Sequence, residues 1–410
     1  MSSDRPVQVI VYLDAIDLGP RRAVGVLRMA GRGEGSIFTY ARSWLDWTGS
    51  FPLDPSLPLY EADRFVERLP GAIADAAPDR WGRRLLDRRE AITAAQQGRR
   101  RRTLRDWDYL LGVADRGRMG ALRLATAPGA QHFLSDAPGA VPPLADLRRL
   151  EHAAGAVERG ADPSDDELRL LVDPGSSLGG ARPKATYADT DGTMWIAKFP
   201  SGNDVREVGA WEHLLVSLGE RAGIQVPDHR LHRLGVNGRT FATRRFDRSG
   251  ERRHLVVSGM TLARRADGED ASYLEIAQAI ADHGDPSEID ADLQQLFRRV
   301  AFNVMVANRD DHLRNHAFIR RRGGWRLAPA YDINPAPERV GHALAIDDAN
   351  RDPSIDLVRS TAAFYRLRVA RADAIIHEVA SAIADWQRHA RALDLPADEI
   401  GLVATAVRSW

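Results

Sequence analysis

Short apolar runs separated by turns characterise the beginning of the chain, and apolar residues at helical spacing characterise its end. Residues 7–13, 23–29 and 36–40 are short and apolar, and the glycine-rich residues 31–35 lie between the last two. These runs predict three β-strands. Residues 79–95 instead place apolar side chains near helical spacing, which predicts an α-helix. The first part of the chain is therefore expected to combine strands with a helix.

A second pattern begins after residues 127–143, which are rich in proline, glycine and alanine and predict a linker at a domain boundary. Residues 185–199 and 231–246 then have the pattern of two hairpins, and residues 204–222 between them have that of an amphipathic helix. From residue 287 onward the pattern is mainly helical. A small unit of loop, hairpins and helix followed by a helical unit is the layout of a two-lobed kinase.

The sequence Asn308-Arg-Asp-Asp-His-Leu-Arg-Asn315 directly follows the long helix predicted at residues 287–307. Protein kinases use the loop H-R-D-x-x-x-x-N, in which the Asp accepts the proton of the acceptor hydroxyl and the Asn binds magnesium. Asp310 and Asn315 are five positions apart here, as in that motif, while Asn308 replaces its histidine. The pattern predicts Asp310 as the catalytic base and Asn315 as a magnesium ligand.

A second metal ligand is expected at Asp332, seventeen positions after Asn315. A short strand pair between the two would return Asp332 to the same site, as happens to the Asp of the kinase D-F-G motif. Magnesium prefers oxygen ligands and retains water, so one Asp and one Asn are a sufficient contribution from the protein.

Lys198 ends an apolar strand, as does the lysine of the kinase V-A-I-K pattern, which holds the α- and β-phosphates of ATP. The helix that follows offers Glu207 and Glu212 as the acidic partner of this lysine. Glu212 is preferred because it lies among the apolar residues of the helix. Upstream, the small-residue loop 175–184 stands where a phosphate-covering loop is expected, since glycines let backbone N–H groups approach phosphate oxygens.

Composition excludes several kinds of chemistry and partner. The 410 residues contain no cysteine, which excludes disulfides, zinc–thiolate sites and cysteine nucleophiles. The 57 basic and 57 acidic residues balance, so the overall charge does not attract nucleic acid. The apolar run at residues 9–13 is too short for a signal peptide or a membrane span, so we expect a cytoplasmic protein without membrane contact.

Four blocks in order resemble the HipA family of bacterial serine/threonine protein kinases, the toxins of type II toxin–antitoxin pairs. The blocks are Ser177–Lys184, Ala197–Pro200, Asn308–Asn315 and Leu327–Asp332. Shorter matches such as Trp44-Leu45 and Gly120–Leu122 extend the resemblance over nearly the whole chain.

The resemblance implies an α+β fold in three parts. Residues 1–126 would form a β-rich N-terminal subdomain packed on a two-lobed, protein-kinase-like core. Residues 144–246 would form the first lobe with the phosphate loop, and residues 247–410 the mainly helical second lobe with the catalytic and metal-binding loops.

The resemblance also implies phosphorylation of a protein serine or threonine that depends on ATP and Mg²⁺. The implied ATP contacts come from the phosphate loop, the adenine strand and the pocket lining: Gly179, Gly180, Ala181, Lys184, Arg244, Phe246, His312 and Tyr331. Arg244 stands where the family commonly has an acidic residue, so only a backbone contact carries over at that position. Ser177, or its neighbour Ser176, would be autophosphorylated, which would switch the kinase off. The phosphate adds about two negative charges to a loop built to hold phosphates, so the loop would leave the site.

The implied partners are a helix-turn-helix antitoxin, DNA only through that antitoxin, and a protein substrate such as a translation component, for example an aminoacyl-tRNA synthetase.

Two alternative functions stay open. A small-molecule phosphotransferase of the aminoglycoside- or choline-kinase type also uses an Asp, an Asn and a second Asp, although the N-terminal subdomain and Ser177 argue against it. An inactive kinase could act as a transcriptional co-regulator with the antitoxin, although Lys198, Asp310, Asn315 and Asp332 are all present.

Overall fold

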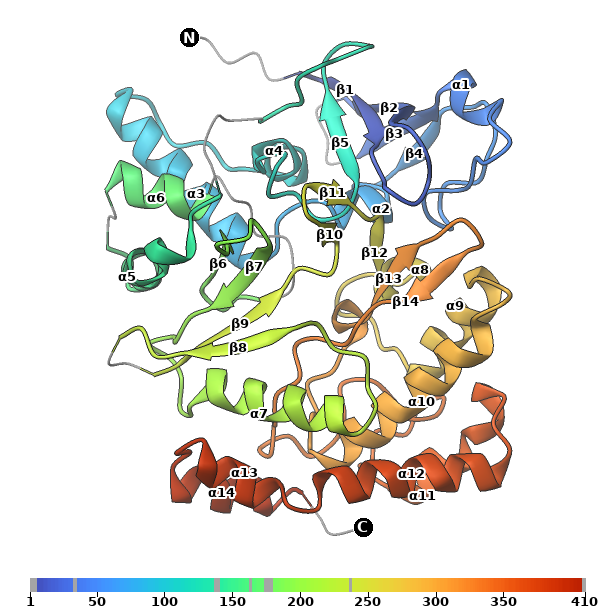
Figure 1. Ribbon diagram of the computed structural model, residues 1–410. Coiled ribbons are helices and arrows are strands. Elements are labelled where there is room, and N and C mark those ends of the chain that lie inside the picture. The colour runs from blue at the N-terminus through green and yellow to red at the C-terminus, as the bar shows by residue number, and fades with distance from the viewer. Residues whose placement is uncertain are drawn as a thin grey trace. The chain divides into compact units, whose positions relative to one another are not determined.

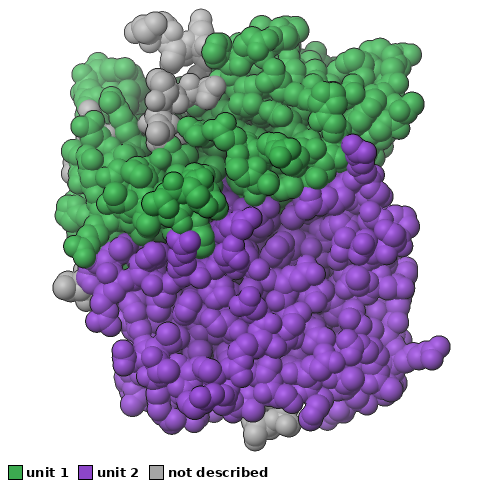
Figure 2. Space-filling model, in the orientation of Figure 1, with its two compact units in different colours: residues 1–202, 247–257 green, residues 203–246, 258–410 purple. Residues whose placement is uncertain are grey.

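The computed structural model describes residues 6–31, 35–135, 141–161, 164–172, 180–235 and 238–407 (Figure 1). The chain forms two compact units, coloured separately in Figure 2. Unit 1 contains residues 1–202 and 247–257, and unit 2 contains residues 203–246 and 258–410. The chain therefore passes from unit 1 to unit 2, returns to unit 1 for a short segment and ends in unit 2.

A five-stranded antiparallel sheet forms part of unit 1, in the order β4-β3-β2-β1-β5. The strands are β1 (Gln8–Leu13), β2 (Arg22–Met29), β3 (Ser36–Tyr40), β4 (Arg64–Val66) and β5 (Leu122–Ala125). Buried and half-buried residues alternate along β3, which is the pattern of a sheet with one covered face. The three strands predicted from the first apolar runs are confirmed.

The helices of unit 1 include the one predicted at residues 79–95. They are α1 (Arg42–Leu45), α2 (Gly71–Ala74), α3 (Arg80–Gln96), α4 (Asp106–Gly112), α5 (Leu147–Glu158) and α6 (Asp165–Val172). Helix α3 begins at a side-chain cap, because the Asp79 carboxylate accepts a hydrogen bond of 2.8 Å from the Gly82 N–H. Arg84 of α3 donates to the Glu158 carbonyl at 2.6 Å, so a cation meets the negative end of the α5 dipole.

Two hairpins and a short strand complete unit 1. The hairpin predicted at residues 185–199 is formed by β6 (Lys184–Ala188) and β7 (Met194–Lys198). The returning segment contributes β10 (Arg248–Ser249), β11 (Arg252–Arg253) and β12 (Val256–Ser258). The fully buried Asp247 carboxylate accepts from the Gly120 N–H at 2.9 Å, which ties this segment to the N-terminal part of unit 1.

Unit 2 is mainly helical, as its pattern predicted. Its strands are the antiparallel pair β8 (His229–His232) and β9 (Thr240–Arg244) and the hairpin of β13 (Ala317–Arg320) and β14 (Trp325–Leu327). Its helices are α7 (Val208–Arg221), α8 (Gly259–Leu262), α9 (Tyr273–His283), α10 (Ile289–Met305), α11 (Ile355–Ser360), α12 (Val369–Ile383), α13 (Trp386–Ala392) and α14 (Ala397–Ala404). Helix α10 is central, because it packs against α9, α11 and α12 and fully buries Leu296, Phe297 and Val300.

Candidate active site

The predicted catalytic loop begins where α10 ends. Ala307 adopts the left-handed conformation (φ +55°), and the Asn308 N–H donates to the Asn303 carbonyl at 2.9 Å. A left-handed residue closes a helix end and turns the chain away from the axis. For a residue other than glycine this conformation costs on the order of 1 kcal/mol, so it persists only where surrounding contacts impose it. The loop therefore leaves a rigid, buried helix along a fixed path.

The two adjacent aspartates of the loop have opposite environments. The Asp310 side chain is 57% exposed, whereas that of Asp311 is 5% exposed. One oxygen of Asp311 accepts hydrogen bonds from Tyr273 Oη (2.8 Å), Asn303 Nδ2 (2.7 Å) and His316 Nε2 (2.9 Å). Burial acts to raise the pKa of Asp311, but the charge and hydrogen bonds of its partners lower it overall. Asp311 is therefore a buried anchor for the loop, and Asp310 is the carboxylate that an acceptor can reach.

Asn308, which replaces the histidine of the kinase motif, connects the catalytic loop with the segment that carries Asp332. Its Nδ2 donates to Asn303 Oδ1 at 3.0 Å, and its Oδ1 accepts from the Asn334 N–H at 3.4 Å. Asp332 has a left-handed φ of +59°. The predicted strand pair, β13 and β14, lies between the two loops in the chain and brings the Asp332 segment back to the end of α10.

Asn315 presents an oxygen that fits a metal ion. The residue is 6% exposed, and within the described ranges its Oδ1 has no hydrogen-bond partner. A buried acceptor without a donor from the protein is left for water or for a bound group. Its backbone N–H is held by the His312 carbonyl at 2.8 Å, and Asp332 is half-buried in the same unit. An amide oxygen and a carboxylate match the ligands that magnesium prefers.

An aromatic pair lies beside the predicted metal ligands. Phe246 stacks on Tyr331, with ring centroids 5.6 Å apart and planes at 28°. Tyr331 Oη donates to the Arg314 carbonyl at 2.6 Å, which fixes the ring against the catalytic loop. Both aromatic residues are half-buried, as is His312 in the loop. The structure thus brings together two of the residues that the family resemblance assigns to the ATP pocket.

Arg244 ends β9 two residues before Phe246, and its side chain forms an ion pair with a carboxylate of the protein. Its guanidinium is 48% exposed and pairs with Asp228 at 2.8 Å. The expectation that only the backbone of Arg244 meets a nucleotide stays a prediction.

The two candidate partners of Lys198, Glu207 before helix α7 and Glu212 within it, have different environments. Glu212 is 2% exposed in the middle of the helix, whereas Glu207 precedes the helix and pairs with Arg239 at 3.2 Å. Burial therefore favours Glu212 as the positioning carboxylate. No side chain of its own caps α7; instead, the Glu399 carboxylate accepts from the Glu207 N–H (3.1 Å) and from Trp211 Nε1 (2.7 Å).

In unit 1, Lys184 and Lys198 are directly opposite each other in the β6–β7 register. They are the only two lysines among the 57 basic residues of the sequence. Lys184 is 2% exposed, with its Nζ 2.7 Å from Asp79 Oδ2 and 3.1 Å from the Gly180 carbonyl; Lys198 is 8% exposed. The lysine ammonium is a compact charge with three donors, which suits contact with single oxygen atoms such as those of Asp79 and Gly180.

The phosphate loop is described only from Gly180 onward. Gly180 has a left-handed φ of +88°, and its carbonyl accepts from the Trp81 N–H at 3.4 Å. Ala181 is exposed. Gly179 and Ser177 lie outside the described residues.

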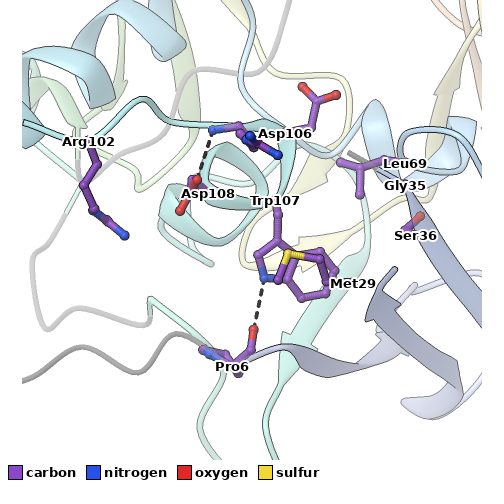
Figure 3. A pocket seen from close by; sticks show the side chains of 10 residues that line it. Pro6, Met29, Gly35, Ser36, Leu69, Arg102, Asp106, Trp107 and Asp108 are labelled. Atoms are coloured by element: carbon purple, nitrogen blue, oxygen red, sulfur yellow. Dashed lines mark hydrogen bonds between the residues drawn. The ribbon is translucent and has the colours of Figure 1, made fainter. Parts of the chain in front are cut away.

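A cavity of about 220 Å³ in unit 1 contains none of the predicted site residues (Figure 3). It lies between the N-terminal sheet and the start of α4, beside Met29, Leu69 and Trp107, and Trp107 Nε1 donates to the Pro6 carbonyl at 3.0 Å.

Among the described residues, no helix is both long and apolar enough to cross a bilayer.

Several residues that shape the site had no recognisable signal in the sequence. Tyr273 and Asn303 reach Asp311 from α9 and α10. Arg339 Nη2 lies 2.5 Å from Asp310 Oδ1. The two-lysine composition was a usable signal for Lys184 and Lys198, but no local spacing relates Arg339 to Asp310.

The α+β fold agrees with matches to known proteins. Residues 176–387 match the HipA-like C-terminal domain, and residues 18–124 match the HipA N-terminal domain. The chain belongs to the HipA family.

A solved HipA from Shewanella oneidensis MR-1, in complex with HipB and its operator DNA, is similar with a TM-score of 0.67 and 16% identity. The similarity covers 97% of this chain and 95% of that one, and it confirms the expected fold. A Haemophilus influenzae protein provisionally named a kinase is 28% identical over 163 residues, which cover 35% of this chain. The match spans about half the length of that relative (47%).

Proposed function

We propose that this chain is an ATP- and Mg²⁺-dependent serine/threonine protein kinase that acts as the toxin of a HipA-type toxin–antitoxin pair. The observation that supports the proposal most strongly is the catalytic loop. It combines an exposed Asp310 with a buried Asn315 whose Oδ1 has no partner among the described residues, and Asp311 anchors it to the core.

In the proposed reaction, the acceptor hydroxyl oxygen attacks the γ-phosphorus of ATP. The bond from that phosphorus to the bridging oxygen breaks, ADP leaves with the electron pair, and the hydroxyl proton passes to Asp310. Asn315 and Asp332 would hold Mg²⁺, which when bound neutralises charge on the phosphates. Lys198, positioned by Glu212, would bind the phosphates from the end of β7.

The remaining roles follow from family membership and are proposals of the same kind. Gly179, Gly180, Ala181 and Lys184 would contribute to the phosphate loop, and Phe246, Tyr331, His312 and the Arg244 backbone to the nucleotide pocket. Ser177 would be the autophosphorylated residue. The division into a subdomain at 1–126 and lobes at 144–246 and 247–410 is proposed on the same ground.

The proposed partners are a helix-turn-helix antitoxin, which would supply any DNA contact, and a cytoplasmic protein substrate from the translation machinery, such as an aminoacyl-tRNA synthetase. The Shewanella relative was solved with HipB and operator DNA, which supports the antitoxin proposal.

Labelled ATP tests the proposal. The purified chain is incubated with Mg²⁺ and γ-labelled ATP beside Asp310→Asn, and phosphorylated residues are mapped by mass spectrometry. Asp356→Asn, at an 89% exposed position away from the loop, is the matched control. We expect label on Ser177 or Ser176 in the wild type and the control only, and a higher Mg²⁺ requirement in Asn315→Leu.

Two other outcomes would contradict a protein kinase. Transfer to an aminoglycoside or choline, but to no protein, would assign a small-molecule phosphotransferase. Absence of transfer from a folded chain that still binds ATP and a helix-turn-helix protein would assign a co-regulator without kinase activity.

A further inference from the structure

Hydrogen bonds attach the segment that follows Asp332 in the chain to the catalytic loop, and three of them flank Arg339 or reach it. They are Ala336 N–H to the Ala307 carbonyl (2.8 Å), Ala343 N–H to the Arg309 carbonyl (2.9 Å), and Arg309 Nη1 to the Arg339 carbonyl. Two backbone–backbone bonds and one bond from the Arg309 side chain therefore hold the segment, before, at and after Arg339, against the loop that carries Asp310.

Arg339 extends from this fixed backbone to the predicted base. Its Nη2 lies 2.5 Å from Asp310 Oδ1, and the two side chains are 48% and 57% exposed. An ion pair this exposed contributes little to folding. A structural role accordingly gives little reason for the contact, whereas its position on the predicted catalytic carboxylate gives a chemical one.

We propose that Arg339 is a positioning residue for phosphoryl transfer, which holds Oδ1 of Asp310 so that Oδ2 faces the acceptor hydroxyl. The inference rests on the proposed kinase function. An exposed aspartate rotates about two side-chain bonds, and a general base must lie within hydrogen-bond reach of the proton that it accepts. A guanidinium on a fixed backbone removes that freedom and leaves one carboxylate oxygen for the acceptor.

The neighbouring residue supplies a matched control. Glu338 pairs with Arg206 at 3.0 Å, so this ion pair also belongs to the segment but does not include Asp310. Glu338→Gln removes a charge pair next to Arg339 and leaves the guanidinium in place. The comparison separates the loss of any ion pair on the segment from the loss of the one that contacts the base.

The test measures autophosphorylation of the full chain with Mg²⁺ and γ-labelled ATP, in the wild type, Arg339→Ala, Arg339→Lys and Glu338→Gln. We expect Arg339→Ala to lower the maximal rate about 10- to 100-fold, the range for a misplaced catalytic group. The KM for ATP should stay within about twofold, because ground-state nucleotide binding is unchanged. Arg339→Lys should be intermediate and Glu338→Gln close to the wild type.

Chemical rescue gives a readout that a purely structural role would not change. Free guanidinium at about 50 mM, far below the molar concentrations that unfold proteins, should restore part of the rate of Arg339→Ala. It should not restore Asp310→Asn or accelerate the wild type.

Each contrary result identifies what fails. An active wild type with an equally active or faster Arg339→Ala would overturn the inference alone, and the faster variant would mean that Arg339 blocks the base. A loss in Arg339→Ala that guanidinium does not relieve would also overturn it. A wild type without any phosphate transfer would overturn the proposed function and this inference with it.

Discussion

The buried carboxylate of Asp311 lies 2.9 Å from Nε2 of His316, five residues further along the same loop. The contact closes the loop on itself, with Asn315 inside it and Asp310 outside. Tyr273 and Asn303 donate to the same carboxylate oxygen, so four side chains from α9, α10 and the loop share one polar centre. A satisfied buried network of this kind fixes a single arrangement of the groups around it.

The hydroxyl of Tyr273 should contribute measurably to stability through this network. Tyr273→Phe is expected to lower the free energy of unfolding by about 2 kcal/mol, because it removes a buried hydrogen bond to a charged acceptor. Tyr365→Phe is the control, since Tyr365 is equally buried but its hydroxyl has no partner in the described part of the chain. Urea denaturation of the wild type and of both variants measures the free energies of unfolding. Equal losses in the two variants would show that the Tyr273 hydrogen bond contributes nothing specific.

Lys184 should be required for folding through its ion pair with Asp79, in addition to any role toward ATP. Lys184→Met leaves a buried carboxylate uncompensated and is expected to cost about 3–5 kcal/mol. Asp79→Asn keeps a competent cap for α3, so the double variant should recover much of that loss. The melting temperatures of the wild type, the two single variants and the double variant complete a double-mutant cycle. Strictly additive losses would contradict a coupled pair.

Glu399 should stabilise α7 from a distant part of the chain. Its carboxylate caps a helix that has neither a side-chain cap nor an acidic residue in its first turn. Glu399→Ala is expected to lower the free energy of unfolding by about 1–2 kcal/mol and to speed hydrogen exchange at the start of α7. Asp398→Ala, one residue earlier at an exposed position, should change stability by less than about 0.5 kcal/mol. Unchanged exchange in Glu399→Ala would refute the cap.

Two histidines, the buried His342 and the half-buried His213, should make the protein less stable as the pH falls below neutrality. Burial lowers the pKa of His342 and of His213 to about 4, while an unfolded histidine titrates near 6.5. The unfolded chain therefore binds protons that the folded chain does not between pH 6.5 and 4. Stability is complete above about pH 6.5 and is lost on acidification, by roughly 1 kcal/mol per pH unit for each histidine.

Replacement of one histidine separates this effect from general acid denaturation. His342→Asn should flatten the dependence of unfolding free energy on pH across that window, whatever its effect at pH 7. His132→Asn, at an exposed position, is the control substitution. Identical slopes in the wild type and His342→Asn would contradict the assignment.

Much of the fold could be predicted because it depends on local periodicity. Short apolar runs between turns and helical spacing are properties of neighbouring residues, and they correctly placed β1 to β3, α3, the β6–β7 hairpin, α7 and α10. The spacing of Asp310 and Asn315 is local in the same sense, since both residues lie in the short loop that follows α10. The roles assigned to these residues stay predictions until they are measured.

What the tertiary structure decided is which groups of distant origin meet. The sequence presents two adjacent aspartates, and only the packing of α9 against α10 assigns Asp311 to the core and Asp310 to solvent. The contacts of Arg339 with Asp310 and of Glu399 with Trp211 join residues 29 and 188 positions apart. No periodic pattern encodes such pairs, because they depend on how whole elements pack around a shared core and not on the conformation of neighbouring residues.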